Sequence, residues 1–111
     1  MTFEDIRRIE TEFDIKLPER YVRFLQRCDR SRVADAFYVD VKAIIENNRD
    51  LRTADYWRSD FFAIGGDGCG NIWCLNLLDP SVQVWIWEHD PSEGFSVEFT
   101  DSDALFQSYG G

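Results

Sequence analysis

The sequence has no long hydrophobic run, few cysteines and one histidine. No apolar stretch approaches the roughly 20 residues that a membrane-spanning helix requires. The first residues, Met1 to Asp5, have neither a basic region nor an apolar signal core. The three cysteines, Cys28, Cys69 and Cys74, are an odd number and fit free thiols in a reducing compartment. These absences predict a cytoplasmic protein that does not insert into membranes.

Positive charge is also scarce. Twelve Lys and Arg stand against 21 Asp and Glu, which gives a net charge of −9. A field of this sign repels nucleic acid and anionic membranes and attracts basic partners, so direct binding of nucleic acid is disfavoured. With 44% hydrophobic and 15% aromatic residues, the chain predicts a folded globule. We expect one domain over residues 1–111.

The first part of the chain predicts two helices. Thr2, with Asp5 three residues later, resembles a capping box. Apolar residues then recur at helical spacing, at Ile6, Ile9 and Phe13. Pro18 suits the first turn of a second helix. The apolar stripe of that helix is Tyr21, Phe24, Leu25 and Cys28.

Residues 27–35 are polar and predict a loop, 36–41 a strand and 44–49 a short helix. Residues 61–76 predict a central hairpin, because two aromatic and β-branched runs flank a cluster of four glycines. Further strands are expected at 82–87 and 95–99. Thr100 resembles the N-cap of a final helix. The predicted fold is α+β: an antiparallel or mixed sheet of about five strands, two N-terminal helices and one C-terminal helix.

Asp67, inside the glycine cluster, has two interpretations. The turn could bind an anion through its N–H groups, or Asp67 could contact a partner. The pattern matches neither a phosphate-binding loop nor a dinucleotide fingerprint nor a calcium loop. We favour a structural role, in which Asp67 accepts bonds from nearby backbone N–H groups.

Cys69 and His89 are the residues that an enzyme or a metal site would use. The Cys-x4-Cys pair formed with Cys74 is a poor match to structural zinc spacing. Acids on both sides of His89 favour its charged form, which suits an ion pair better than a base. We therefore predict no catalytic residue, metal or cofactor. An enzyme that uses Asp67, Cys69 and His89 is kept as a third hypothesis, after the two binding roles given below.

The tryptophans predict a protein-binding surface. Alternation in the strand at 82–87 places Trp85 and Trp87 on one face, opposite Val84 and Ile86. If helices cover only one side of the sheet, one of these sets faces outward or into a groove. Exposed tryptophan beside acids is typical of binding hot spots. The predicted partner-binding residues are Trp57, Asp67, Trp85, Trp87, Glu88, Asp90 and Glu93.

Three blocks of the sequence, taken together and in order, resemble the signatures of the SUKH superfamily. They are residues 15–21 followed by Phe24 and Leu25, residues 61–71, and residues 84–90. The superfamily groups a fungal cell-wall-synthesis regulator with many small bacterial immunity proteins. The resemblance extends from about Ile9 to Phe106.

The resemblance implies an α+β sheet flanked by helices and a non-enzymatic role. That role is to bind and neutralise a cognate toxin domain, often a nuclease and here expected to be basic. We expect a monomer or weak homodimer. The alternative keeps the fold but changes the class: an intracellular regulatory or scaffold module without a toxin partner.

Overall fold

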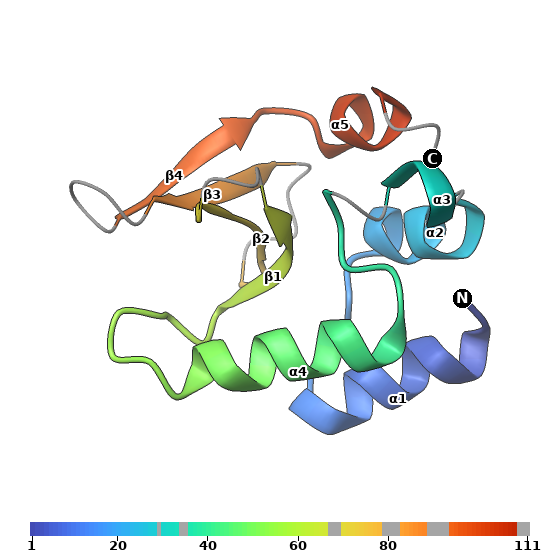
Figure 1. Ribbon diagram of the computed structural model, residues 1–111, viewed down its shortest axis with the longest axis horizontal. Helices are drawn as coiled ribbons and strands as arrows, with labels where there is room; N and C mark the ends of the chain where they lie inside the picture. Colours follow the sequence, from blue (N-terminus) through green and yellow to red (C-terminus); the bar gives the residue numbers. More distant parts are fainter. Residues whose placement is uncertain (29, 34–35, 67–69, 79–82, 89–93, 109–111) are drawn as a thin grey trace.

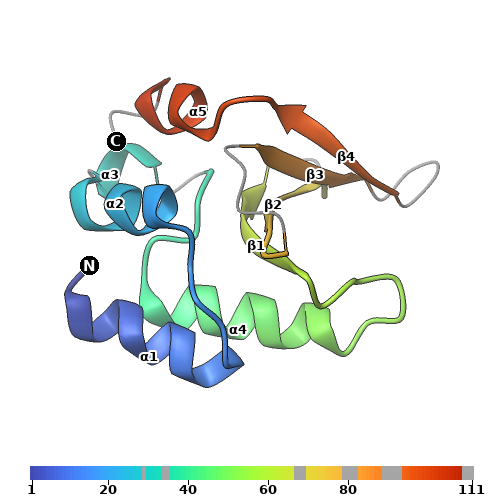
Figure 2. The same cartoon turned by 180° about the vertical axis from the view of Figure 1, so that it is seen from behind.

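The computed structural model describes residues 1–28, 30–33, 36–66, 70–78, 83–88 and 94–108. In chain order its elements are α1 (Phe3–Phe13), α2 (Glu19–Arg27), α3 (Arg30–Val33), α4 (Val41–Arg52), β1 (Phe61–Gly66), β2 (Ile72–Asn76), β3 (Val84–Glu88), β4 (Gly94–Phe99) and α5 (Ser102–Ser108). The strands form one antiparallel sheet in the order β1-β2-β3-β4. Helices α1 and α4 lie side by side below it, whereas α2, α3 and α5 gather at its side (Figures 1 and 2). The predicted α+β class is confirmed.

The prediction of a strand at residues 36–41 is wrong. Phe37 forms only an isolated antiparallel bridge with Gly65. Asp40 then accepts a hydrogen bond from the N–H of Ala43 at 2.8 Å and so caps α4. Because the helix begins directly after this cap, too little extended chain is left to form a strand. The sheet in the described part of the chain has four strands instead of about five.

The first helix has the predicted capping box. The N–H of Asp5 donates to the Thr2 hydroxyl at 3.1 Å, and the N–H of Thr2 donates to the Asp5 carboxylate at 3.2 Å. Pro18 is the N-cap of α2. These local patterns therefore predicted where both helices begin.

The other helices differ more from expectation. Helix α4 extends beyond the predicted 44–49 at both ends, and α3 lies in the predicted loop at 27–35. Helix α5 begins at Ser102, one residue later than a cap at Thr100 would place it. No helix in the described ranges is both long and apolar enough to span a membrane.

The predicted hairpin at residues 61–76 is confirmed, since β1 pairs with β2. Gly65 allows the segment before α4 to pass closely over β1. A Cβ at this position would lie 2.0 Å from the carbonyl oxygen of Ala36, which is a steric overlap. The turn residues 67–69 lie outside the described residues.

Candidate protein-binding surface

Alternation along the strands separates two apolar clusters, one on each face of the sheet. The face toward the helices belongs to the main core and carries Phe62, Ile64, Trp73, Leu75, Val84 and Ile86. The opposite face, here called the second face, carries Phe61, Ala63, Cys74, Trp85, Trp87 and Phe95. The prediction that Trp85 and Trp87 lie on one face of the sheet, opposite Val84 and Ile86, is therefore confirmed.

The connection from α4 to β1, residues 53–60, covers part of the second face. Tyr56 stacks on Trp87 with ring centroids 4.5 Å apart and planes 17° from parallel. Trp57 lies buried beneath the connection, and its indole N–H donates to the carbonyl oxygen of Phe61 at 3.2 Å. Its ring meets Phe95 edge-on at 5.2 Å. Tyr56 and Trp57 thus supply the aromatic part of the cover, while Leu51 at the end of α4 and Ala54 also pack against this cluster.

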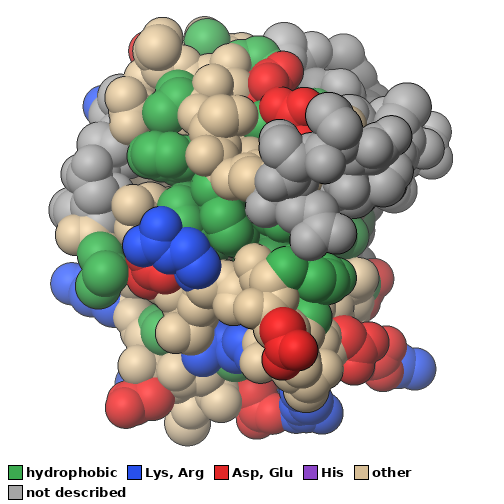
Figure 3. All heavy atoms as spheres, turned by 90° about the vertical axis from the view of Figure 1, so that its left-hand side faces the viewer, with side chains coloured by type: hydrophobic (Ala, Val, Ile, Leu, Met, Phe, Trp, Pro, Cys, Tyr) green, Lys and Arg blue, Asp and Glu red, His purple; other side chains and the backbone are tan. Residues whose placement is uncertain are grey.

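This cover is incomplete and leaves an aromatic patch, which consists of Tyr56, Ile72, Trp85, Phe95 and Val97. Tyr56 is 43% exposed and Val97 39% exposed, and the other three are half-buried. Strand register makes the patch continuous, because Trp85 lies opposite Val97, and Trp87 lies between Ile72 and Phe95. Figure 3 shows hydrophobic side chains gathered across the middle of this side of the molecule, with charged ones around them.

Charge is distributed very unevenly along the chain. Residues 1–58 hold all 12 Lys and Arg together with 12 of the 21 acids, so their formal charges cancel. Residues 59–111 hold the other nine acids and carry the whole net charge of −9. Among described residues, Glu88 and Glu98 make no ion pair, whereas Asp101 pairs with Arg20 at 3.3 Å. The sheet and the aromatic patch therefore lie mainly in the acidic half.

The predicted contact residues fall into three groups. Trp57 and Trp87 are buried, so they support the patch from beneath. Trp85 is a half-buried member of the patch, and Glu88 is half-buried at the end of β3. The remaining three, Asp67, Asp90 and Glu93, lie outside the described residues.

Four residues of the patch were absent from the predicted set: Tyr56, Ile72, Phe95 and Val97. The position of Tyr56 next to Trp57, as an aromatic pair in a polar stretch, was the available signal. For Phe95 and Val97 it was the alternation of β4, which places both on the same face.

The described cysteines occupy structural positions. Cys74 is fully buried on β2, where burial raises the pKa of its thiol and its Sγ donates to the carbonyl oxygen of Trp85 at 3.7 Å. Cys28 is half-buried and donates to the carbonyl oxygen of Leu25 at 3.9 Å. Within the described ranges no cluster of His, Cys, Asp and Glu could hold a metal. Cys69 and His89 lie outside these ranges.

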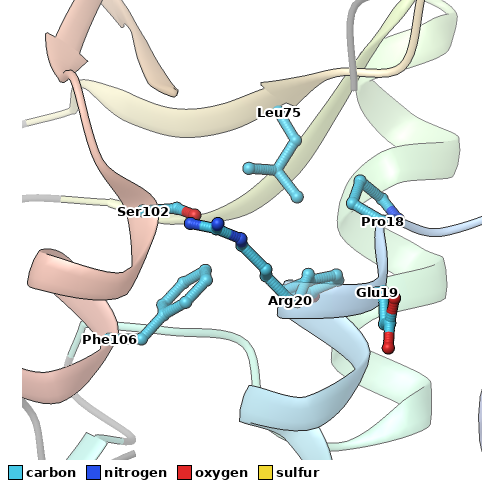
Figure 4. A pocket seen from close by; sticks show the side chains of 7 residues that line it. Pro18, Glu19, Arg20, Leu75, Ser102 and Phe106 are labelled. Carbon is cyan, nitrogen blue, oxygen red and sulfur yellow. The ribbon is translucent and has the colours of Figure 1, made fainter. Parts of the chain in front are cut away.

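A pocket of about 300 Å³ lies between α2, β2 and α5. Arg20 extends across it toward Ser102 (Figure 4). Glu19 points away from Ser102 and pairs with Arg23. The described lining therefore does not bring a base to the Ser102 hydroxyl, as nucleophilic catalysis would require.

The order of the elements, with helices gathered against one face of a single antiparallel sheet, defines an α+β domain of the SUKH type. Residues 1–106 match the SMI1/KNR4 family (SUKH-1), and the chain belongs to that family. The resemblance carried by the three sequence blocks is thus confirmed. Comparison with curated proteins and with solved structures gives no match. Membership is compatible both with toxin immunity and with a regulatory role.

Proposed function

We propose that this protein is the immunity protein of a bacterial polymorphic toxin system. It binds a cognate toxin domain in the cytoplasm, covers the surface that the toxin needs for its activity, and performs no chemistry of its own. It acts as one domain over residues 1–111, as a monomer or weak homodimer. The observation that carries this proposal is the aromatic patch on the acidic half of the chain.

The patch has the physical properties of an interface centre. Aromatic side chains bury a large area, and Tyr adds a polar hydroxyl that can bond a partner. Stacking on Trp87 already restricts Tyr56, so Tyr56 loses little rotamer freedom when a partner binds. Buried Trp57 and Trp87 keep the support rigid, Trp85 contributes aromatic area to the contact, and Glu88 borders it. Asp67, Asp90 and Glu93 complete the proposed contact set.

The distribution of charge favours a basic partner. Nucleases bind phosphates with basic grooves, so an acidic protein surface can occupy such a groove in place of the nucleic acid. Complementary charge also accelerates association and makes it sensitive to salt. Residues 59–111, without any Lys or Arg, supply this field close to the patch.

Co-expression with the C-terminal domain encoded by the adjacent gene tests the proposal. We expect the native chain to restore growth of cells that produce this domain. Tyr56→Ala and Trp85→Ala should weaken the rescue, since each removes aromatic area from the patch. Phe3→Ala is the matched control, because Phe3 is a 65% exposed aromatic residue on α1, away from the second face.

Two results would count against this function. A neighbouring gene without a toxin, together with a stable partner that is no toxin, would favour the regulatory alternative. Equal rescue by all three variants would remove the aromatic patch from the interface.

A further inference from the structure

The two outer strands of the sheet, β1 and β4, differ in whether other parts of the chain form hydrogen bonds to their outer edges. On β1, the side chain of Asn48 bonds both the N–H and the carbonyl oxygen of Ala63, at 2.7 and 2.9 Å. Farther along the same edge, the backbone of residues 36–38 accepts a bond from the N–H of Gly66 at 2.9 Å and donates one to the carbonyl oxygen of Ile64 at 3.0 Å. The edge of β1 is therefore closed by the chain itself.

Within the described residues, the edge of β4 is open. In the described part of the chain, no backbone group outside the sheet bonds to β4, and its middle residues Ser96, Val97 and Glu98 are exposed. Natural edge strands are usually protected by Lys, Pro or a bulge. The strand has neither Lys nor Pro, and its one charged residue is Glu98. Its bulge, opposite the Val84–Trp85 step, leaves residues 94–97 in regular pairing with β3.

We propose that the open edge of β4 receives an extended, basic segment of the partner protein as a fifth strand; the existence of such a partner rests on the proposed function. Backbone hydrogen bonds between the two strands supply affinity, and alternate side chains supply specificity. The added strand extends the second face, so apolar side chains of the segment on that face pack beside Phe95 and Val97. The aromatic patch and the edge thus form one continuous surface.

Charge identifies the occupant as basic and distinguishes it from a second copy of this chain. Glu98, the bulge residue that follows the regularly paired stretch 94–97, makes no ion pair among the described residues, and residues 59–111, which form the sheet, contain no Lys or Arg. Two copies joined through β4 would bring two acidic halves together, which like-charge repulsion disfavours. A Lys- or Arg-rich segment gains attraction at the same place.

A display library of random decapeptides, selected against the full chain, tests this inference without the natural partner. We expect enrichment of peptides in which Lys or Arg alternates with β-branched or aromatic residues. A bound peptide should slow hydrogen–deuterium exchange at alternate backbone amides of β4. Its affinity should fall by about tenfold in Glu98→Lys, since the substitution reverses the charge of the edge.

Glu46→Lys is the matched control, because it makes the same charge change at an exposed position on α4. It should lower affinity by less than about twofold. The inference is overturned if no basic peptide is enriched, if both variants lose affinity equally, or if protection falls outside β4. It is also overturned if β4 becomes protected without peptide as protein concentration rises, since the occupant is then a second copy. None of these outcomes bears on whether the chain binds a toxin, because the peptide experiment does not use the natural partner.

Discussion

The side chain of Asn48 takes the place of a neighbouring strand for Ala63. It accepts from the backbone N–H and donates to the carbonyl oxygen of that one residue, while being itself only 1% exposed. A side-chain amide can do this because it carries the same donor and acceptor as a peptide group. One residue of α4 thereby closes the edge of β1 at Ala63 and fixes the helix to the sheet.

Asn48→Ala should lower the free energy of unfolding by about 2–4 kcal/mol, since it leaves a buried donor and a buried acceptor of Ala63 without partners. Urea unfolding followed by tryptophan fluorescence measures this. Asn47→Ala is the control: Asn47 is the preceding residue on the same helix, and within the described residues its amide bonds the carbonyl oxygen of Ala43 and no group of the sheet. Similar losses in both variants would mean that the sheet edge does not depend on Asn48.

Tyr56 and Trp87 are stacked but should respond differently to truncation. Trp87→Ala removes a buried ring that contacts Trp57 and Tyr56, and should cost about 3–5 kcal/mol of stability. Tyr56→Ala should cost about 1 kcal/mol or less, because this ring lies at the surface. Thermal unfolding compares the two. A Tyr56 variant as unstable as the Trp87 variant would identify Tyr56 as core instead of contact surface.

Tyr21 should make the protein sensitive to alkali. Its hydroxyl is buried without a hydrogen-bond partner among the described residues, and this burial raises the pKa of the phenol. Above pH of about 10 the unfolded chain loses the proton while the folded chain retains it. Stability therefore falls as pH rises through this range, by up to about 1.4 kcal/mol per pH unit for this group.

Tyr21→Phe should flatten this alkaline decline and leave stability at neutral pH equal or about 1 kcal/mol higher, since it removes the unpaired hydroxyl and keeps the ring. Denaturant titrations at a series of pH values provide the measurement. Cys74 contributes a decline of the same sign, which persists in the variant. An unchanged pH profile would show that the Tyr21 hydroxyl is not desolvated in solution.

Local signals in the sequence predicted much of this fold. The capping box of Thr2, the position of Pro18 and the alternation in β3 each depend on a few neighbouring residues. The residues near Phe37 have strand composition, but Asp40 caps a helix that begins directly after them. Local propensity could not decide between the strand and the helix.

The candidate surface was harder to predict, since its parts meet only through tertiary packing. The sequence placed Trp85 and Trp87 on one face but could not place Tyr56 over Trp87. It also could not indicate which sheet edge stays open. That depends on where α4 brings Asn48, and an isolated asparagine in a helical segment carries no such signal.

The most direct test of the account is the binding of the full chain to the C-terminal domain encoded by the adjacent gene, measured by calorimetry at about 50 and about 300 mM salt. The account predicts an equimolar complex whose affinity falls at least about tenfold at the higher salt, because an acidic surface meets a basic one. Absence of a complex, or an affinity that salt leaves unchanged, would contradict it.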